Sequence, residues 1–313
     1  MRVTFMGSGG LGLSALRSIV ASGHEVELVV TPYEARANPD GTPYPSVAAY
    51  ARRRGLRIIR SESNVCDETV QTNALLKPDI VISANWPRLI PRSVLDHARF
   101  GGFNVHRSLL PAYGGLDPIN WAVVNGETES GVTIHVLDEP IDLGDIILQR
   151  RFSIETSETG FDVHRKSLRL VAEMVPEVLQ RLESGTVART AQDPAKLTMF
   201  PRRSEHDNRI DWRAGNVEIY NLIRAQADPF PNAHSSIGGV KLRIKSASLA
   251  TGSIQGRAGS IADRSSGGVI VLCGGDDGSA RSGLIVHEVQ EVSGHPTDAR
   301  DYFVEGIDRF DEE

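Results

Sequence analysis

The first thirty residues constrain the fold of this chain more than any other part. Residues 3–6 read as a short apolar strand, and a glycine-rich turn follows at residues 7–12. An amphipathic stretch then runs to residue 20, and residues 26–30 read as a second apolar strand. A strand, a tight turn, a helix and another strand are the usual opening of a parallel sheet covered by helices.

The same alternation continues along the chain. We expect strands and helices near residues 46–54 (helix), 56–59 (strand), 68–76 (helix), 80–83, 102–106, 132–136 and 146–152 (strands), and 159–182 (helix). Strands that alternate with helices favour a sheet wound on both faces. We therefore predict that residues 1–190 form an α/β domain with a doubly wound, Rossmann-like, mostly parallel sheet.

The character of the chain changes after Gly185. Prolines become frequent, one helix is expected near residues 217–225, and short strands are expected near 241–247, 268–272 and 284–292. Short strands between Gly, Ser and Asp turns indicate a small β-barrel or sandwich. We assign residues 204–313 to this second, smaller domain.

Composition excludes several classes of protein. Hydrophobic residues make up 40% and charged residues 24% of the 313 positions, which is typical of a folded soluble chain. We find no secretory leader and no run of about 18 apolar residues, so a membrane partner is not expected and the cytoplasm is the default location. Cys66 and Cys273 lie far apart, without a Cys/His cluster, so no metal is expected. A net charge of −6 gives no general attraction to nucleic acid.

The glycine-rich turn leaves three interpretations open. Gly7-Ser-Gly9-Gly10-Leu-Gly12 matches the G-x-G-x-x-G pattern of dinucleotide-binding folds. NAD or FAD binding also needs a carboxylate at the end of the second strand, where this chain has Thr31 followed by Pro32. The turn could instead serve close packing, or its amides could hold an acidic group of another substrate. The last possibility makes Gly9 and Gly10 candidates for substrate binding.

The segment from Phe103 to Gly115 carries the clearest candidate chemistry. Asn104 and His106 are two residues apart, so on a strand their side chains point to the same side. Ligands of doubly wound sheets bind at the carboxyl ends of strands, which is where this pair is expected. Such a pair could also be a hydrogen-bonded strand end without a function.

A second segment, residues 131–147, runs from a strand into a loop with three carboxylates, Asp138, Glu139 and Asp142. Together the two segments resemble the formyltransferases that use 10-formyltetrahydrofolate. The family pattern Asn-x-His-x-Ser-Leu-Leu-Pro stands here at residues 104–111, and its Asp-x-Gly pattern falls on Asp142 and Gly144, 36 residues after His106. The resemblance extends to residues 209–231 and implies an OB-like C-terminal barrel.

The resemblance implies a role for each of these residues. Asn104 would donate to the oxygen that becomes negative during formyl transfer, His106 would donate or shuttle a proton, and Asp142 would orient the imidazole. His135 is expected to be structural. The folate cosubstrate would lie against Trp86, Arg88, Leu89, Ile90, Leu137, Asp138, Glu139 and Ile141. Ser108 and Tyr113 join Gly9 and Gly10 as candidate substrate contacts.

The amine that accepts the formyl group is harder to predict. Residues 119–131 and 200–203 look closer to siderophore and amino-sugar formyltransferases than to tRNA enzymes, which use a basic insert after the second strand. In residues 31–46 the only basic residue is Arg36, beside Glu34 and Asp40, and residues 191–313 hold 14 Lys and Arg against 18 Asp and Glu. Nucleic acid is therefore an unlikely partner.

We place N5-hydroxyornithine first as the acceptor, and a nucleotide-linked amino sugar second. Methionyl-tRNA is a further alternative, and a folate-binding protein without turnover is an alternative of another class. One departure from the family pattern concerns Gly114, because many relatives have an arginine at that position. Whatever contact that arginine makes elsewhere has no counterpart predicted here.

Overall fold

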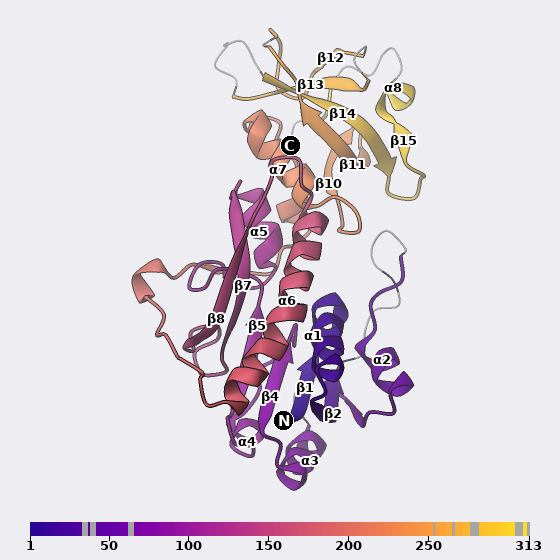
Figure 1. Cartoon of the computed structure of the whole chain (residues 1–313). Helices are drawn as coiled ribbons and strands as arrows, with labels where there is room; N and C mark the ends of the chain where they lie inside the picture. Colours follow the sequence, from indigo (N-terminus) through magenta and orange to yellow (C-terminus); the bar gives the residue numbers. More distant parts are fainter. Residues whose placement is uncertain are drawn as a thin grey trace.

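The structure, a computed structural model, describes residues 1–32, 37, 42–61, 66–252, 254–264, 267–275, 282–303 and 309–311. Glu34, Arg36 and Asp40, on which the argument about the basic insert rests, lie outside these residues. Two large sheets organise the described chain, one at each end of the molecule (Figure 1).

The N-terminal sheet has seven strands in the order β3-β2-β1-β4-β5-β7-β8. The strands are β1 (Arg2–Gly7), β2 (Glu25–Thr31), β3 (Ile58–Arg60), β4 (Ile80–Ala84), β5 (Gly102–His106), β7 (Glu129–Val136) and β8 (Ile146–Ser153). The first five strands are parallel, whereas β7 runs antiparallel to both β5 and β8. The sheet is therefore mostly parallel with an antiparallel edge.

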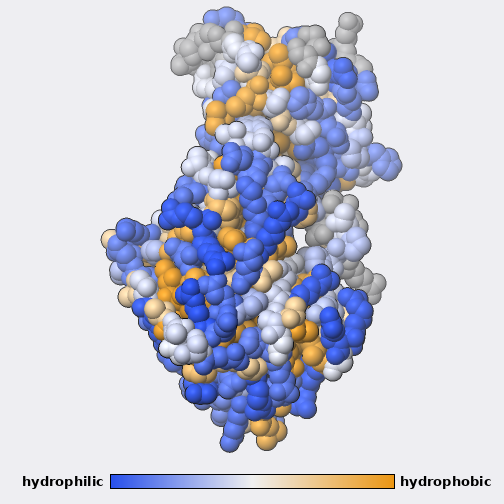
Figure 2. Space-filling view, in the orientation of Figure 1, coloured by the Kyte–Doolittle hydropathy of each residue, from blue (hydrophilic) through white to orange (hydrophobic). Residues whose placement is uncertain are grey.

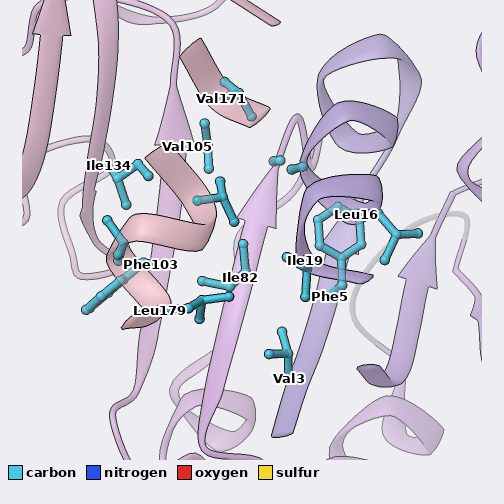
Figure 3. Packing of buried hydrophobic residues seen from close by; sticks show 14 of the residues in the cluster. Val3, Phe5, Leu16, Ile19, Ile82, Phe103, Val105, Ile134, Val171 and Leu179 are labelled. Carbon is cyan, nitrogen blue, oxygen red and sulfur yellow. The ribbon is translucent and has the colours of Figure 1, made fainter. Parts of the chain in front are cut away.

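Helices cover both faces of this sheet, which confirms the doubly wound prediction. The helices are α1 (Gly9–Ala21), α2 (Val47–Arg53), α3 (Asp67–Leu76), α4 (Arg92–Leu95), α5 (Pro118–Val124) and α6 (Gly160–Glu183). Helices α1, α2 and α6 pack on one face, and α3 and α4 lie on the other. Figure 3 shows the first of these layers, where Phe5, Leu16 and Ile82 meet between the helices and the sheet.

Helix α6 spans the domain because its sequence gives it both a start and a buried face. Thr159 and Asp162 form a reciprocal capping box at its N-terminus. Val171, Val175 and Val178 recur at helical spacing and are buried. The helix therefore places residues 160–170 close to the carboxyl ends of the central strands.

The C-terminal sheet is antiparallel, in the order β10-β11-β14-β13-β12, with β15 paired to β14. Its strands are β10 (Ala233–Ile237), β11 (Val240–Leu249), β12 (Ile261–Asp263), β13 (Val269–Cys273), β14 (Ser282–Glu291) and β15 (Thr297–Asp298). Helices α7 (Asn216–Ala225) and α8 (Ala299–Tyr302) pack against it. This arrangement agrees with the predicted α/β domain followed by a smaller β domain.

Short pairings and helix contacts join the two parts. Strands β6 (Gly114–Gly115) and β9 (Met199–Phe200) pair, and short 3₁₀ turns occupy Pro194–Lys196 and His206–Asn208. Helix α7 packs against α5, where the Asn120 side chain donates to the carbonyl of Ala225 at 2.9 Å. The space-filling view shows a largely hydrophilic face with separate hydrophobic patches, one of them over the C-terminal sheet (Figure 2). No helix among the described residues is long and apolar enough to cross a membrane.

Candidate active site

A cavity of about 590 Å³ opens at the carboxyl ends of β4 and β5. Asn104 and His106 come from β5, and Trp86, Arg88, Leu89 and Ile90 come from the segment after β4. The loop that follows β7 contributes Leu137, Asp138, Glu139, Ile141 and Asp142. The structure thus gathers all the predicted catalytic and folate-binding residues around one cavity.

Asn104 lies in a polar cluster with His135 and Asp142. Its amide nitrogen is 3.2 Å from His135 Nε2 and donates to Asp142 Oδ1 at 3.5 Å. His135 Nδ1 lies 2.9 Å from the carbonyl oxygen of Val136, and this contact orients the ring so that Nε2 faces both Asn104 and Asp142. Asn104 and His135 are direct partners across the β5–β7 pair. The Asn104 amide is therefore positioned from two sides.

His106 is buried and has a defined orientation. Its Nε2 donates to the carbonyl oxygen of Tyr113 at 2.8 Å, and its Nδ1 lies 3.7 Å from Asp142 Oδ2. Burial lowers the pKa of His106, and the nearby Asp142 charge works in the opposite direction. The neutral ring thus carries its proton on Nε2 and presents Nδ1 toward the carboxylate, ready to accept a proton.

Asp142 is the anionic member of the cluster. Its Oδ2 accepts from the amide of Gly115 at 2.9 Å, and its Oδ1 lies 3.4 Å from His135 Nε2. Burial raises the pKa of Asp142, but His106, His135 and the Gly115 amide outweigh this effect and lower it to about 2. The carboxylate is therefore ionised at neutral pH.

Local backbone contacts explain the Asp-x-Gly pattern. Asp142 has a φ of +58°, and Gln192 donates to the carbonyls of both Asp142 and Gly144, at 2.7 and 2.8 Å. A Cβ on Gly144 would clash with the carbonyl oxygen of Val136. Glycine is needed at position 144 because only it lets the loop fold back against β7 and hold Asp142 in place.

The wall predicted to bind folate has the character that a flat heteroaromatic group needs. Leu89 and Ile141 line the cavity and are 62% and 53% exposed, so they offer apolar surface to a ligand. The indole nitrogen of Trp86 is buried and has no hydrogen-bond partner among the described residues. Arg92 pairs with Asp138 at 2.6 Å at the edge of this wall. A ligand with both apolar surface and hydrogen-bond acceptors fits this wall.

The four predicted substrate residues are not among those that line the cavity. Ser108 is buried and donates to the carbonyl of Ala112, and the Tyr113 hydroxyl donates to Glu127. An added Cβ on Gly9 would lie 2.6 Å from the Tyr44 hydroxyl, and one on Gly10 would lie 3.2 Å from His164 Nε2. The turn is thus closely packed, in agreement with the interpretation that its glycines permit close approach.

Several residues at the site were not singled out by sequence reasoning. His135, which we expected to be structural, joins Asn104 and Asp142, and Gly115 and Gln192 hold Asp142. Arg107 also lines the cavity. Of these residues, only Arg107 could have been predicted from the sequence to line the cavity, because it directly follows His106 at the end of a strand. The contacts of His135, Gly115 and Gln192 with Asp142 depend on the pairing of segments that are far apart in the sequence.

The position where relatives have an arginine is sterically restricted here. Gly114 pairs with Met199 in the β6–β9 ladder, and a Cβ on Gly114 would lie 2.5 Å from Met199 Sδ. Met199 itself lines the cavity and is 49% exposed. The methionine therefore occupies space that a side chain at position 114 would need.

Comparisons with known proteins match both parts of the chain. Residues 5–179 match the family model described as "Formyl transferase", and residues 203–305 match "Formyl transferase, C-terminal domain". A methionyl-tRNA formyltransferase from Geobacter metallireducens is 33% identical over 88% of this chain and 88% of its own length. A second, from Caldanaerobacter subterraneus subsp. tengcongensis, is 30% identical over 97% of this chain and 96% of its own length.

A solved structure shares the fold. An N-formyltransferase from Helicobacter canadensis, in complex with folinic acid and dTDP-3-aminofucose, superposes with a TM-score of 0.69 and 22% identity, covering 91% of this chain and 98% of its own. At this identity the likeness shows the common fold.

Proposed function

The chain belongs to the formyltransferase family, and from this premise we propose that Asn104, His106 and Asp142 carry the transfer of a formyl group from 10-formyltetrahydrofolate to an amine. The family and the relatives make this chain a folate-dependent N-formyltransferase. The assignment of roles to individual residues is our proposal. The observation that carries it is the cluster of Asn104, His106 and Asp142 in one cavity.

Each residue of the cluster has a chemical task that its contacts allow. The formyl oxygen becomes negative as the amine attacks, and the Asn104 amide supplies hydrogen-bond donors at that point. Neutral His106 can take a proton from the attacking nitrogen at Nδ1, and the ionised Asp142, 3.7 Å away, stabilises the imidazolium that results. The imidazolium then returns this proton to N10 of the folate as the bond between N10 and the formyl carbon breaks, so that tetrahydrofolate leaves as a neutral amine. His135 positions Asn104 from the opposite side.

The cosubstrate supplies the formyl group when it is bound. Leu89, Ile90, Leu137 and Ile141 would pack against its ring system, and the buried Trp86 indole could donate to it. Exclusion of water by this wall would strengthen the hydrogen bonds that Asn104 offers.

For the acceptor, we propose methionyl-tRNA first. The support is the similarity, at 30–33% identity over nearly the whole chain, to methionyl-tRNA formyltransferases. The curated relatives named above are methionyl-tRNA formyltransferases, so methionyl-tRNA replaces N5-hydroxyornithine as the first candidate.

A small amine, such as a nucleotide-linked amino sugar or N5-hydroxyornithine, is the second candidate because a specific observation favours it. Residues 191–313 carry more acidic than basic residues, and the net charge of the chain is −6. A tRNA partner would need basic groups along its path, since phosphate contacts supply most of the affinity.

A panel of acceptors tests the proposed formyl transfer and the choice between the two acceptor candidates. Wild-type protein and His106→Ala would be incubated with 10-formyltetrahydrofolate and either methionyl-tRNA, N5-hydroxyornithine or a dTDP-amino sugar, with His97→Ala as a control for loss of a surface histidine. We expect tetrahydrofolate release and formylated methionyl-tRNA with wild type and His97→Ala, and loss of both with His106→Ala. Turnover with a small amine alone would move the second candidate into first place. Failure with all three acceptors would refute both acceptor assignments and favour the alternative of a folate-binding protein without turnover.

A further inference from the structure

Arg107 places a positive charge in the cavity wall directly after the catalytic histidine. Its guanidinium is partly buried, and its hydrogen bond runs to His164 Nδ1 at 2.6 Å. No carboxylate of the described chain lies within salt-bridge distance of it. Burial lowers the pKa of Arg107, and Asp117 and then Tyr44 act in the opposite direction; Asp117 also lines the cavity but accepts the backbone amide of Arg203 at 3.0 Å.

A half-buried guanidinium without a carboxylate partner is an unusual arrangement. Burial of a charge costs free energy unless an opposite charge compensates it, and buried arginines in folded proteins are normally paired. Burial lowers the pKa of Arg107, yet the guanidinium stays protonated at any physiological pH. The chain therefore maintains a partly desolvated cation that is available to pair with an incoming anion.

His164 fixes the direction of this cation. Burial, and then the Arg107 charge, lower the pKa of His164 to about 3, so the ring is neutral and accepts from Arg107. Phe161 stacks on the ring with centroids 5.7 Å apart, and Phe230 of the C-terminal part lies nearly perpendicular to it with centroids 6.4 Å apart. His164 is thus a positioning residue for Arg107.

The first turn of α1 lies beside the Arg107–His164 pair and reaches the cavity at Leu11. A Cβ on Gly10 would lie 3.2 Å from His164 Nε2, and Leu11 lines the cavity with Arg107. The N-cap Ser8 makes no side-chain cap to this helix, so the positive end of a 13-residue helix adds to the field of Arg107. The charge of Arg107 is also close enough to His106 to lower the pKa of its imidazole.

We propose that Arg107 binds an oxyanion of the acceptor, a carboxylate or a phosphate, and so places the acceptor's amine beside His106. The inference rests on the proposed function for what the acceptor is, and it names the group by which that acceptor is recognised. A guanidinium presents a planar fork of donors that suits either oxyanion.

Binding of simple anions tests the subsite without any turnover. Inorganic pyrophosphate and L-ornithine would be titrated calorimetrically into wild type, Arg107→Gln, Arg107→Lys and Arg202→Gln. Arg202 lines the same cavity, so its variant removes one positive charge from the wall at another place. Thermal unfolding and tetrahydrofolate binding would show that each variant is folded.

We expect saturable binding of at least one anion to wild type, at least tenfold weaker binding to Arg107→Gln, partial recovery in Arg107→Lys, and less than a twofold change in Arg202→Gln. Binding of pyrophosphate alone would identify a phosphate as the recognised group, and binding of L-ornithine alone a carboxylate. Absence of saturable binding, equal losses in both glutamine variants, or a loss in Arg202→Gln alone would overturn the proposal.

A kinetic arm separates this inference from the proposed function. For an acceptor with an oxyanion, Arg107→Gln should raise KM at least tenfold and leave kcat within about threefold, because the subsite acts on binding. Formyl transfer with unchanged KM in Arg107→Gln would leave the function in place and refute the subsite. Anion binding that depends on Arg107, without formyl transfer to any acceptor, would refute the function and leave the subsite in place.

Discussion

Two histidines of the N-terminal domain sit beside opposite charges. His106 faces the Asp142 carboxylate at 3.7 Å, whereas His164 faces the Arg107 guanidinium at 2.6 Å. Burial lowers the pKa of both imidazoles, but Asp142 opposes this shift at His106, and Arg107 adds to it at His164. The imidazole of His106 can thus gain a proton, whereas the imidazole of His164 is kept neutral. The neighbouring charge, rather than burial alone, separates a candidate catalytic histidine from a positioning one.

The largest effects on activity should follow from truncating the side chains that cluster around Asp142. Asn104→Ala, His106→Ala and Asp142→Ala should each lower kcat by about 100-fold or more, because each removes a group that acts on developing charge. Steady-state kinetics with the best acceptor, together with circular dichroism to verify folding, would measure this. Near-wild-type turnover in any one variant would remove that residue from the mechanism.

The geometry of Asp142 can also be perturbed without touching its carboxylate. Gly144→Ala introduces a Cβ that clashes with the Val136 carbonyl, so we expect the free energy of unfolding to fall by about 1–3 kcal/mol. We also expect kcat to fall by about tenfold as Asp142 moves. Denaturant unfolding and kinetics would be compared with Gly275→Ala, where no atom of the described residues lies within 4 Å of the added Cβ. Equal behaviour of the two variants would contradict the close-approach argument.

The low pKa of His164, which contacts Arg107, predicts that the stability of the protein depends on pH. Folding lowers the pKa of His164 from 6.5 to about 3, so the unfolded chain binds the extra proton first as the pH falls. Well above pH 6.5 neither state binds this proton, so the free energy of unfolding does not depend on it. Between pH 7 and pH 5 the free energy of unfolding should decrease by up to about 2 kcal/mol. His164→Gln should flatten this part of the curve, and His97→Gln, which removes an exposed histidine, should not. Parallel curves for wild type and His164→Gln would show that His164 is not held neutral.

The smallest expected effect is a shift in the pH dependence of turnover. Because Asp142 raises the pKa of His106 against burial, Asp142→Asn should lower that pKa and move the acidic limb of the residual kcat to lower pH. The wild-type limb should itself lie below pH 6.5, since the net shift of His106 is downward. A shift of the limb to higher pH in Asp142→Asn would contradict the assigned coupling.

Local pattern was sufficient to predict part of this site. Asn104 and His106 point to one side because they are two residues apart on a strand, and this held in β5. The β7–β8 pair was predicted as strands, but its antiparallel direction is absent from the local pattern. The proximity of His135 to Asn104 follows from the antiparallel pairing of β7 with β5, which makes the two residues register partners and is likewise absent from the local pattern. Nothing local to Arg107 could indicate a contact with His164, which lies 57 residues away on α6.

The two boundary predictions, residues 1–190 and 204–313, remain our proposal for the domains. Strand β10 was not predicted because Ala233–Ile237 contains two serines and a histidine among its five residues, so its apolar alternation is weak. Its pairing with β11, which reads clearly as a strand, explains why it forms.

The most direct test of the central claim is the kcat of a double variant. If His106 and Asp142 act as one unit, His106→Ala combined with Asp142→Ala should lose about as much activity as either single variant, because the second truncation removes a partner that no longer works. The measurement is tetrahydrofolate release under saturating acceptor for wild type, both single variants and the double variant. Losses that multiply, so that the double variant falls by the product of the two single effects, would show two independent contributions and contradict the account.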